Sequence, residues 1–328
     1  MIRMAGHSGR RLILVAGCWT LLVTRIHAAE GIERCVSIPD PAVRLTCYDT
    51  GGARLSVDER SELDRRLETE TLLDTQYFTI IPHRENYLLP LSYMTHVNRS
   101  PETPTQQQVT PWPGMKPVET KFQISFKTEL MRNVMPPKTH LWFAYTQVSY
   151  FQIYDQDDSA PFRETDYEPE AFVQYKLPTR ILGYDSQYLI AGFSHQSNGR
   201  PDPLSRSWNR IYVAAVYAKG PWAILFKPWW RIPESRSSDN NPDLEAYMGY
   251  GELAVARKYN ESTVKLVLHN NFRLDSDNRG SVLASWSFPL DGRFKGYVEY
   301  FNGYGESLID YNIHRQRFSL GITLTDIF

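Results

Sequence analysis

Short segments in which apolar and polar residues alternate recur from about residue 85 to the end of the chain. Lys121–Phe126 (KFQISF) alternates strictly, and so does Leu141–Phe151. Successive residues of a β-strand point to opposite faces, so a period of two predicts strands and not helices. Roughly twelve such segments, each about ten residues long, are separated by turn clusters such as 218–221 (AKGP), which is typical of an antiparallel barrel with an even strand number.

The last of these segments gives the clearest indication of a membrane barrel. Its apolar residues fall on one strand face, namely Phe318, Leu320, Ile322, Leu324 and the terminal Phe328. A closing strand with one lipid-facing side has this pattern. The edge strand of a soluble β-sandwich would also alternate. The aromatic content of 13%, with 20 Tyr and 8 Trp, favours a surface that meets a membrane interface.

The N-terminus carries the one long apolar run of the sequence. Arg10 and Arg11 precede the apolar run Leu12–Val23, and small residues follow at Ala28 and Ala29. We therefore predict a signal peptide over residues 1–29 and an exported protein. An alternative is a lipoprotein signal that ends at Cys18. A bundle of membrane helices is excluded, because it would need several stretches of about 20 apolar residues.

Residues 30–76 differ from the rest and are predicted to form a small N-terminal periplasmic extension ahead of a barrel domain over residues 77–328. Leucines in the charged stretch 56–73 have a spacing compatible with a helix. Cys35 and Cys47 are predicted to form a disulfide, because the compartment is oxidising. The alternative is two free thiols. Neither cysteine has a His or Cys cluster nearby, which argues against a zinc site.

The charge balance argues against nucleic-acid binding. The chain has 36 Lys and Arg against 37 Asp and Glu, a formal net charge of −1, and no long basic run. Proteins that bind nucleic acid through its phosphates need a basic excess or a basic patch.

Candidate chemistry is concentrated in residues 193–210, where a strand ends, a Gly/Pro turn follows and a new strand begins. His195 and Ser197 are two residues apart and therefore share a strand face, whereas Ser194 points to the other face. An imidazole can take the proton of a serine hydroxyl when a third group orients the ring, and Asn209 on the next strand can supply an amide oxygen. Backbone N–H groups of Ser197 and Gly199 are candidate oxyanion donors. The alternative is an ordinary strand end and turn.

The turn itself is rich in oxygen donors. Asp202, Ser205 and the carbonyl of Arg200 are hard ligands of the kind that calcium takes. The spacing is not that of an EF-hand, and a solvated loop is the alternative at this point.

This chain has HQSNGRPDP at 195–203 and SRSWNR at 205–210, and this segment closely resembles the active-site segment of the outer-membrane phospholipase A family. The resemblance covers roughly residues 77–328. It extends to Ser159–Thr165, Tyr167–Pro169, Lys227–Trp229, Asn241–Asp243, Tyr247–Tyr250 and Gly303–Asn312.

The resemblance implies a twelve-stranded barrel with its active site on the lipid-facing wall. It implies Ser197 as nucleophile, His195 as base and Asn209 as the residue that orients the base. It also implies a catalytic calcium between two subunits. The ligands would be the Arg200 carbonyl and Ser205 of one subunit and Ser159 of the other, with Asp202 as a carboxylate at the calcium site. Gln147 takes the place of a glutamine buried at the dimer contact.

The function implied is calcium-dependent hydrolysis of phospholipid acyl esters by a homodimer in the bacterial outer membrane. Both acyl positions and lysophospholipids would be substrates. One alternative is a catalytically inactive barrel that acts as a structural protein or a diffusion channel. The other alternative is a soluble secreted esterase.

Overall fold

The computed structural model divides the chain into two compact units, Met1–Glu59 and Arg60–Phe328. It describes residues 40–42, 44–46, 61–63, 65–66, 79–135, 139–157, 161–181, 184–235, 237–290 and 294–326. The predicted signal peptide, Cys18, Cys35, Cys47, Ser159 and Phe328 lie outside the described residues. The described part of the first unit is a short helical stretch, in which Asp40 Oδ1 accepts a hydrogen bond from the Ala42 backbone at 2.8 Å.

The second unit is almost entirely β-structure. From Ile80 on, its described residues form thirteen strands and one helical turn in the following order: β1 (Ile80–Pro82), β2 (Asn86–Met94), β3 (Val118–Arg132), β4 (Thr139–Phe151), β5 (Phe162–Ile181), β6 (Tyr184–Ser197), β7 (Ser207–Lys219), β8 (Trp222–Arg231), α4 (Glu245–Met248), β9 (Gly251–Tyr259), β10 (Ser262–Asn270), β11 (Gly280–Pro289), β12 (Lys295–Gly303) and β13 (Arg315–Thr325).

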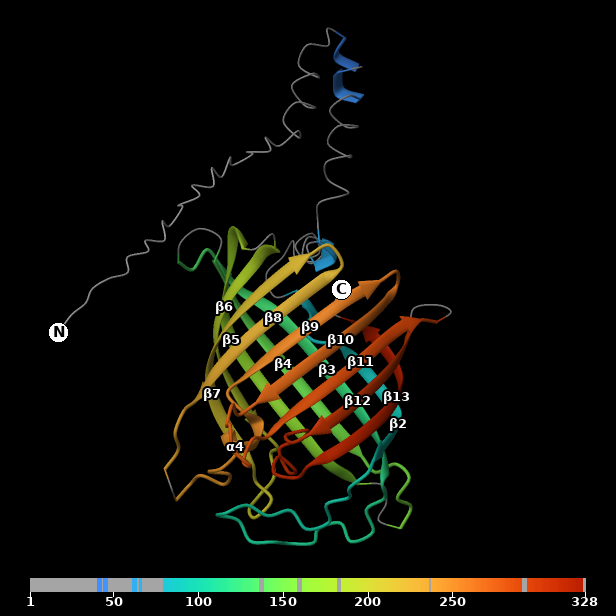
Figure 1. Ribbon diagram of the computed structural model, residues 1–328, viewed down its shortest axis with the longest axis vertical. Helices are drawn as coiled ribbons and strands as arrows, with labels where there is room; N and C mark the ends of the chain where they lie inside the picture. The colour runs from blue at the N-terminus through green and yellow to red at the C-terminus, as the bar shows by residue number, and fades with distance from the viewer. Residues whose placement is uncertain are drawn as a thin grey trace, which may run out of the picture. The chain divides into compact units, whose positions relative to one another are not determined.

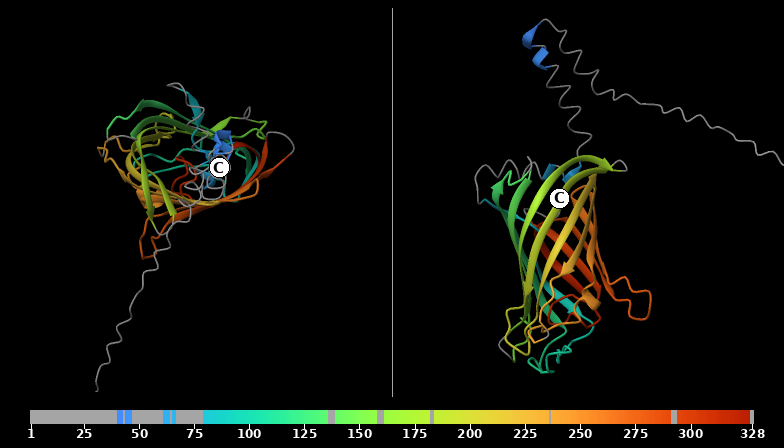
Figure 2. Two further views of the ribbon diagram at one scale, coloured as in Figure 1. Left: turned by 90° about the horizontal axis from the view of Figure 1, so that it is seen from above. Right: turned by 90° about the vertical axis from the view of Figure 1, so that its left-hand side faces the viewer.

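The sheet closes on itself as an antiparallel barrel. Each strand from β2 to β13 pairs with its neighbours in sequence, and β13 pairs back with β2. The short β1 pairs with β3 beyond the end of β2, so it prolongs one barrel position and adds no further strand to the circumference. The views along and across the barrel show this closed wall (Figures 1 and 2). The predicted barrel of about twelve strands is confirmed.

The faces of the strands are inverted relative to a soluble protein. In β13, Phe318 and Leu320 are 53% and 49% exposed on the outside, whereas Arg317 and Ser319, which alternate with them, are buried on the inside. Apolar residues outside and polar residues inside are the pattern of a barrel that stands in lipid. Among the described residues, no helix combines the length and the apolar character needed to cross a membrane.

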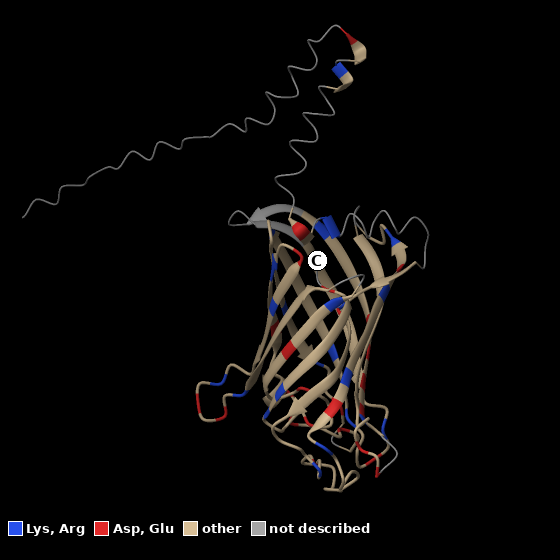
Figure 3. Ribbon diagram, turned by 90° about the vertical axis from the view of Figure 1, so that its right-hand side faces the viewer, with Lys and Arg blue, Asp and Glu red and all other residues tan. Residues whose placement is uncertain are grey.

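The two ends of the barrel are unequal. Tight turns such as Gly220–Pro221 join the strands at one end, while long loops such as 95–117 and 232–250 join them at the other. Short periplasmic turns and long extracellular loops are usual in outer-membrane barrels. Charged residues are prominent in the long loops (Figure 3). The β6–β7 loop belongs to the long-loop end.

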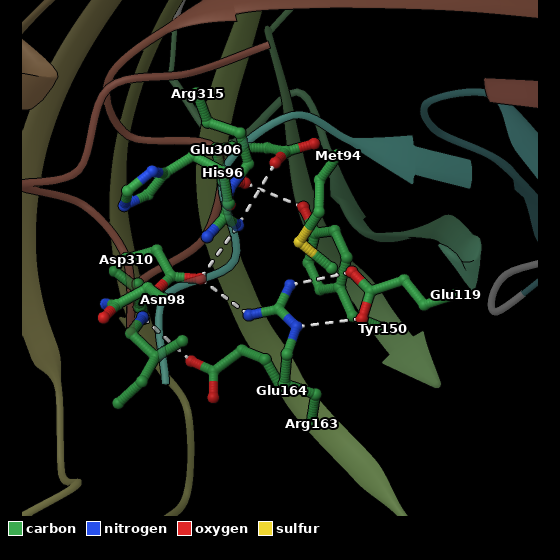
Figure 4. Close-up of polar contacts among 12 residues, drawn as sticks. Met94, His96, Asn98, Glu119, Tyr150, Arg163, Glu164, Glu306, Asp310 and Arg315 are labelled. Carbon is green, nitrogen blue, oxygen red and sulfur yellow. Dashed lines mark hydrogen bonds and ion pairs between the residues drawn. The ribbon is translucent and has the colours of Figure 1, made fainter. Parts of the chain in front are cut away.

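Paired charges occupy much of the described interior. Arg163 binds both carboxylate oxygens of Glu119 at 2.9 Å and reaches Asp310 at 2.7 Å (Figure 4). Arg317 also pairs with Glu119, at 2.8 Å. Elsewhere the lumen retains cavities of about 240 and 210 Å³. Twelve strands leave a narrow interior that side chains can fill, which argues against the diffusion-channel alternative.

Residues 61–66 pack against the end of the barrel that carries the tight turns. Leu63 lies in an apolar cluster with Ala218 and Ala223. Glu62 donates its backbone N–H to the Gly220 carbonyl at 2.9 Å and pairs with Lys258 at 2.9 Å. The compact unit that contains the barrel begins at Arg60. The boundary at residue 77 between the extension and the barrel domain stays a prediction.

Candidate active site

The β6–β7 hairpin brings His195 and Asn209 side by side. The two residues are direct partners in the antiparallel register. His195 Nδ1 lies 2.9 Å from Asn209 Oδ1, a hydrogen-bond distance. An amide oxygen can only accept, so this contact requires the imidazole to carry its proton on Nδ1 and leaves Nε2 free to act as a base.

This pair lies on the outer wall of the barrel. Phe193 and Ile211, the next residues on the same faces of β6 and β7, are exposed to the outside. Ser194 and Arg210 face the interior, where Ser194 Oγ donates to Glu168 at 2.9 Å. Alternation of the strand faces thus separates an outward His195 from an inward Ser194.

Ser197 stands at the last position of β6, on the same face as His195. It is half-buried and lies opposite Ser207 on β7 and Tyr167 on β5. Among the described residues, no hydrogen bond joins the Ser197 hydroxyl to the His195 ring. The structure therefore brings the three predicted residues to one patch of the exterior and couples two of them directly.

Asn198 organises the turn that follows Ser197. Its Oδ1 accepts the Arg206 backbone N–H at 3.0 Å, and its Nδ2 donates to the Leu204 carbonyl at 2.9 Å and to Glu164 on β5 at 3.1 Å. Its own N–H donates to the Arg206 carbonyl at 3.0 Å. That N–H is therefore committed, and the candidate oxyanion donors remain the N–H groups of Ser197 and Gly199.

Gly199 needs to be a glycine for two reasons. Its φ is +62°, a left-handed conformation that other residues adopt only at a cost. An added Cβ would lie 3.2 Å from the Tyr167 ring, a tight contact. The backbone at this point therefore passes close to an aromatic side chain of the outer wall.

Arg200 ties the turn to the start of β5. Its Nη2 donates to the carbonyls of Phe162 and Arg163 at 2.8 Å, and its guanidinium stacks on Trp112 at 4.8 Å from the ring centroid. With the side chain held in this way, the Arg200 carbonyl is a fixed element of the turn.

The candidate calcium ligands lie in the same turn. Asp202 Oδ1 accepts hydrogen bonds from Asn240 at 3.1 Å and from Gln106 at 3.5 Å, while Ser205 is half-buried. The described residues contain no group of three or more His, Cys, Asp or Glu side chains that could hold a metal. The donors present are a carbonyl, a hydroxyl and one carboxylate. They are all oxygens and suit calcium in chemistry, but they are too few for a complete site in one chain.

Gln147 faces outward from β4, close to the same region. Its Oε1 accepts from the Tyr145 hydroxyl at 3.0 Å, and its Nε2 donates to Ser149 Oγ at 3.1 Å. Its register partner on β5 is Tyr167. A polar amide on a lipid-facing wall is costly unless it is satisfied, and here its strand neighbours satisfy it.

Several residues near the site have no signal in the local sequence. Asn240 and Gln106 contact Asp202 from other loops, and Glu164 reaches Asn198 from β5. Glu234 follows β8, where the Ile232 N–H donates to the Asn209 carbonyl at 2.8 Å. The alternation pattern carries no information on these contacts, because it shows neither the strand register nor which loops the folded barrel brings together.

Comparison with known proteins shows the family to which the chain belongs. A family model described as Phospholipase A1 matches residues 63–324. A Neisseria meningitidis relative is 39% identical over 251 residues, which are 75% of this chain and 65% of that protein. The phospholipase A1 of Salmonella typhimurium is 35% identical over 252 residues, which are 76% of this chain and 83% of that protein.

Two solved structures are similar over most of the described chain. Outer membrane phospholipase A from Escherichia coli has a TM-score of 0.69 and 32% identity, and the match covers 76% of this chain and all (100%) of that one. The outer membrane phospholipase dimer of Salmonella typhi with bound calcium has a TM-score of 0.71 and 32% identity, and covers 79% of this chain and 97% of that one. This chain therefore belongs to the phospholipase A1 family and has its closed twelve-stranded β-barrel fold.

Proposed function

We propose that this chain is a calcium-dependent phospholipase A of the outer membrane that hydrolyses acyl esters through Ser197, His195 and Asn209. The observation that carries the proposal is the 2.9 Å contact between His195 Nδ1 and Asn209 Oδ1, with Ser197 on the same outward face. Family membership supports the substrate class. Hydrolysis at both acyl positions and of lysophospholipids is part of the proposal.

The proton steps follow from the tautomer that Asn209 selects. With its Nδ1 proton held by the amide oxygen, His195 takes the Ser197 proton on Nε2 as the hydroxyl oxygen attacks the ester carbonyl. The imidazolium then returns this proton to the alkoxide of the leaving lysolipid. A water molecule repeats the sequence and releases the fatty acid from the acylated serine.

Negative charge develops on the carbonyl oxygen during attack. The N–H groups of Ser197 and Gly199 are the donors proposed to hold it, since the N–H of Asn198 is already bonded within the turn. Calcium supplies additional positive charge beside these donors when it is bound. The Arg200 carbonyl, Ser205 and Asp202 would hold it from one subunit, together with Ser159 of a second subunit.

Homodimerisation supports the same scheme. One chain offers too few oxygen donors for calcium, and a second chain would complete the set. Gln147 is proposed to lie at the dimer contact, where its amide could bond across the interface. A phospholipid would then enter sideways from the bilayer, because the site opens on the outer wall and not in the lumen.

The test is phospholipid hydrolysis by purified protein in mixed micelles. We expect Ser197→Ala to abolish release of fatty acid with calcium present, while the protein remains a folded barrel whose gel mobility changes on heating. We also expect excess chelator to silence the unmodified enzyme and to reduce the dimer fraction found by cross-linking. Hydrolysis that persists in Ser197→Ala would contradict the assignment of Ser197 as the nucleophile. Full turnover in excess chelator would contradict the dependence on calcium.

A further inference from the structure

The proposed array contains no charge to balance the imidazolium. His195 becomes positive when it takes the Ser197 proton, and its orienting partner Asn209 is neutral. A carboxylate in that position would stabilise the cation electrostatically, whereas an amide mainly fixes the ring and its tautomer. A further carboxylate near His195 would therefore contribute more to stabilising the imidazolium here than it would in a triad that already contains an Asp.

Glu234 stands where such a carboxylate is needed. In β8 the side chain of Trp230 points outward and that of Arg231 inward, and the next backbone contact joins the Ile232 N–H to the Asn209 carbonyl at 2.8 Å. The chain therefore still lies beside β7 at Ile232, and Glu234 follows two residues later at the start of the loop, next to the strand that carries Asn209.

One carboxylate oxygen of Glu234 accepts no hydrogen bond from the described residues. Its Oε1 is shielded from solvent and has no hydrogen-bond partner among the described residues. Among the described residues, the charged groups that act on it are Asp239 on the same loop, Arg231 at the end of β8 and His195 on β6. Arg231 is already paired with Asp239 at 2.7 Å. His195 is thus the remaining group in this set whose positive charge has no carboxylate partner of its own.

The electrostatics of Glu234 point the same way. Burial raises the pKa of Glu234 above its ordinary value and Asp239 adds to the rise, while Arg231 and His195 act in the opposite direction. A positive His195 therefore favours the ionised form of Glu234, and an ionised Glu234 favours a positive His195 by the same interaction.

We propose that Glu234 is a positioning residue that stabilises the imidazolium form of His195 and so supplies the negative charge that Asn209 lacks. The inference rests on the proposed function of His195 as the base. Glu234 does not touch the reacting atoms. It acts through His195, from a loop that follows the strand next to Asn209.

The experiment measures kcat/KM for phospholipid against pH, with saturating calcium, for the unmodified protein and for Glu234→Gln. We expect the plateau to fall about three- to tenfold, the factor that half to one pKa unit represents. The acid limb should move to lower pH, because the variant lacks the negative charge that favours the protonated ring. Glu234→Asp should retain most of both properties.

Two further variants make the result specific. Glu261→Gln makes the same chemical change in an exposed turn between β9 and β10 and should leave the profile unchanged. Asn209→Asp places a carboxylate directly on His195, so Glu234→Gln in that background should have a smaller effect than in the unmodified protein.

The outcomes separate this inference from the proposed function. If Glu234→Gln has an unaltered rate and pH profile while Ser197→Ala is inactive, the role of Glu234 is wrong and the triad stands. A lower rate with an unshifted acid limb, or a change confined to calcium dependence, would also overturn it, because either would indicate a loop-supporting role. Activity in Ser197→Ala would instead overturn the function on which the inference depends.

Discussion

An amide partner fixes the orientation of an imidazole ring but gives no electrostatic stabilisation to its protonated form. Asn209 accepts from His195 Nδ1 at 2.9 Å and is held on the neighbouring strand by the antiparallel register. The amide has no negative charge to offer when the ring becomes protonated. Asn209 therefore contributes by selecting the tautomer and the orientation of the His195 ring. Without Asn209, the ring still has this tautomer and orientation for part of the time.

We expect Asn209→Ala to reduce kcat roughly 10- to 100-fold, at the low end of what general-base catalysis contributes. KM should change little, since Asn209 is proposed to contact the base and not the lipid. Steady-state hydrolysis in mixed micelles measures both values. A loss as complete as that of Ser197→Ala would contradict a purely orienting role.

The turn between β6 and β7 is the element on which the site depends. Asn198 bonds both arms of the turn through backbone and side chain, and Glu164 on β5 holds Asn198 from behind. Arg200 ties the same turn to the backbone at the start of β5. The proposed oxyanion donors and the candidate calcium oxygens thus belong to one turn, which a strand outside the hairpin, β5, holds in place.

We expect Asn198→Ala to weaken calcium activation and lower hydrolysis while the barrel stays folded, because the lost bonds lie within one loop. Asn198→Asp is the sharper variant, since it keeps the Oδ1 acceptor for Arg206 and sets a second carboxylate against Glu164. The calcium concentration for half-maximal activity measures the effect. Values equal to those of the unmodified protein in Asn198→Asp would show that the brace is dispensable.

The whole molecule combines an apolar exterior with an interior held by paired charges. Glu119 is fully buried, bonds Arg163 through both oxygens and also pairs with Arg317 (Figure 4). Such a network gains little over apolar packing when complete, but the loss of one member leaves buried charges without partners. The barrel wall around the active site therefore depends on an intact interior.

We expect Glu119→Gln to lower the free energy of unfolding by about 3–5 kcal/mol, the usual cost of breaking a buried ion pair. Glu62→Gln is the matched control, because its pair with Lys258 is partly exposed and should contribute about 0–1 kcal/mol. Urea unfolding of both variants in detergent micelles measures the difference. Equal midpoints for the two would contradict a stabilising role for the Glu119 network.

Much of the barrel, and the pairing of His195 with Asn209 in the candidate site, could be predicted from the sequence because both rest on local rules. Alternation alone predicts which residues of a strand share a face, so it groups Phe318 with Leu320 and separates Ser194 from His195. Consecutive antiparallel strands pair with each other as a hairpin, which puts Asn209 within reach of His195. These relations depend only on strand geometry and sequence spacing.

Only the tertiary structure decided what surrounds the hairpin. Gln106 and Asn240 reach Asp202 across 96 and 38 residues of sequence, and Glu164 reaches Asn198 across 34. Glu234 comes near His195 because β8 follows β7 around the wall. Contacts between different loops depend on strand register and on closure of the barrel, and alternation with a period of two carries no information about either.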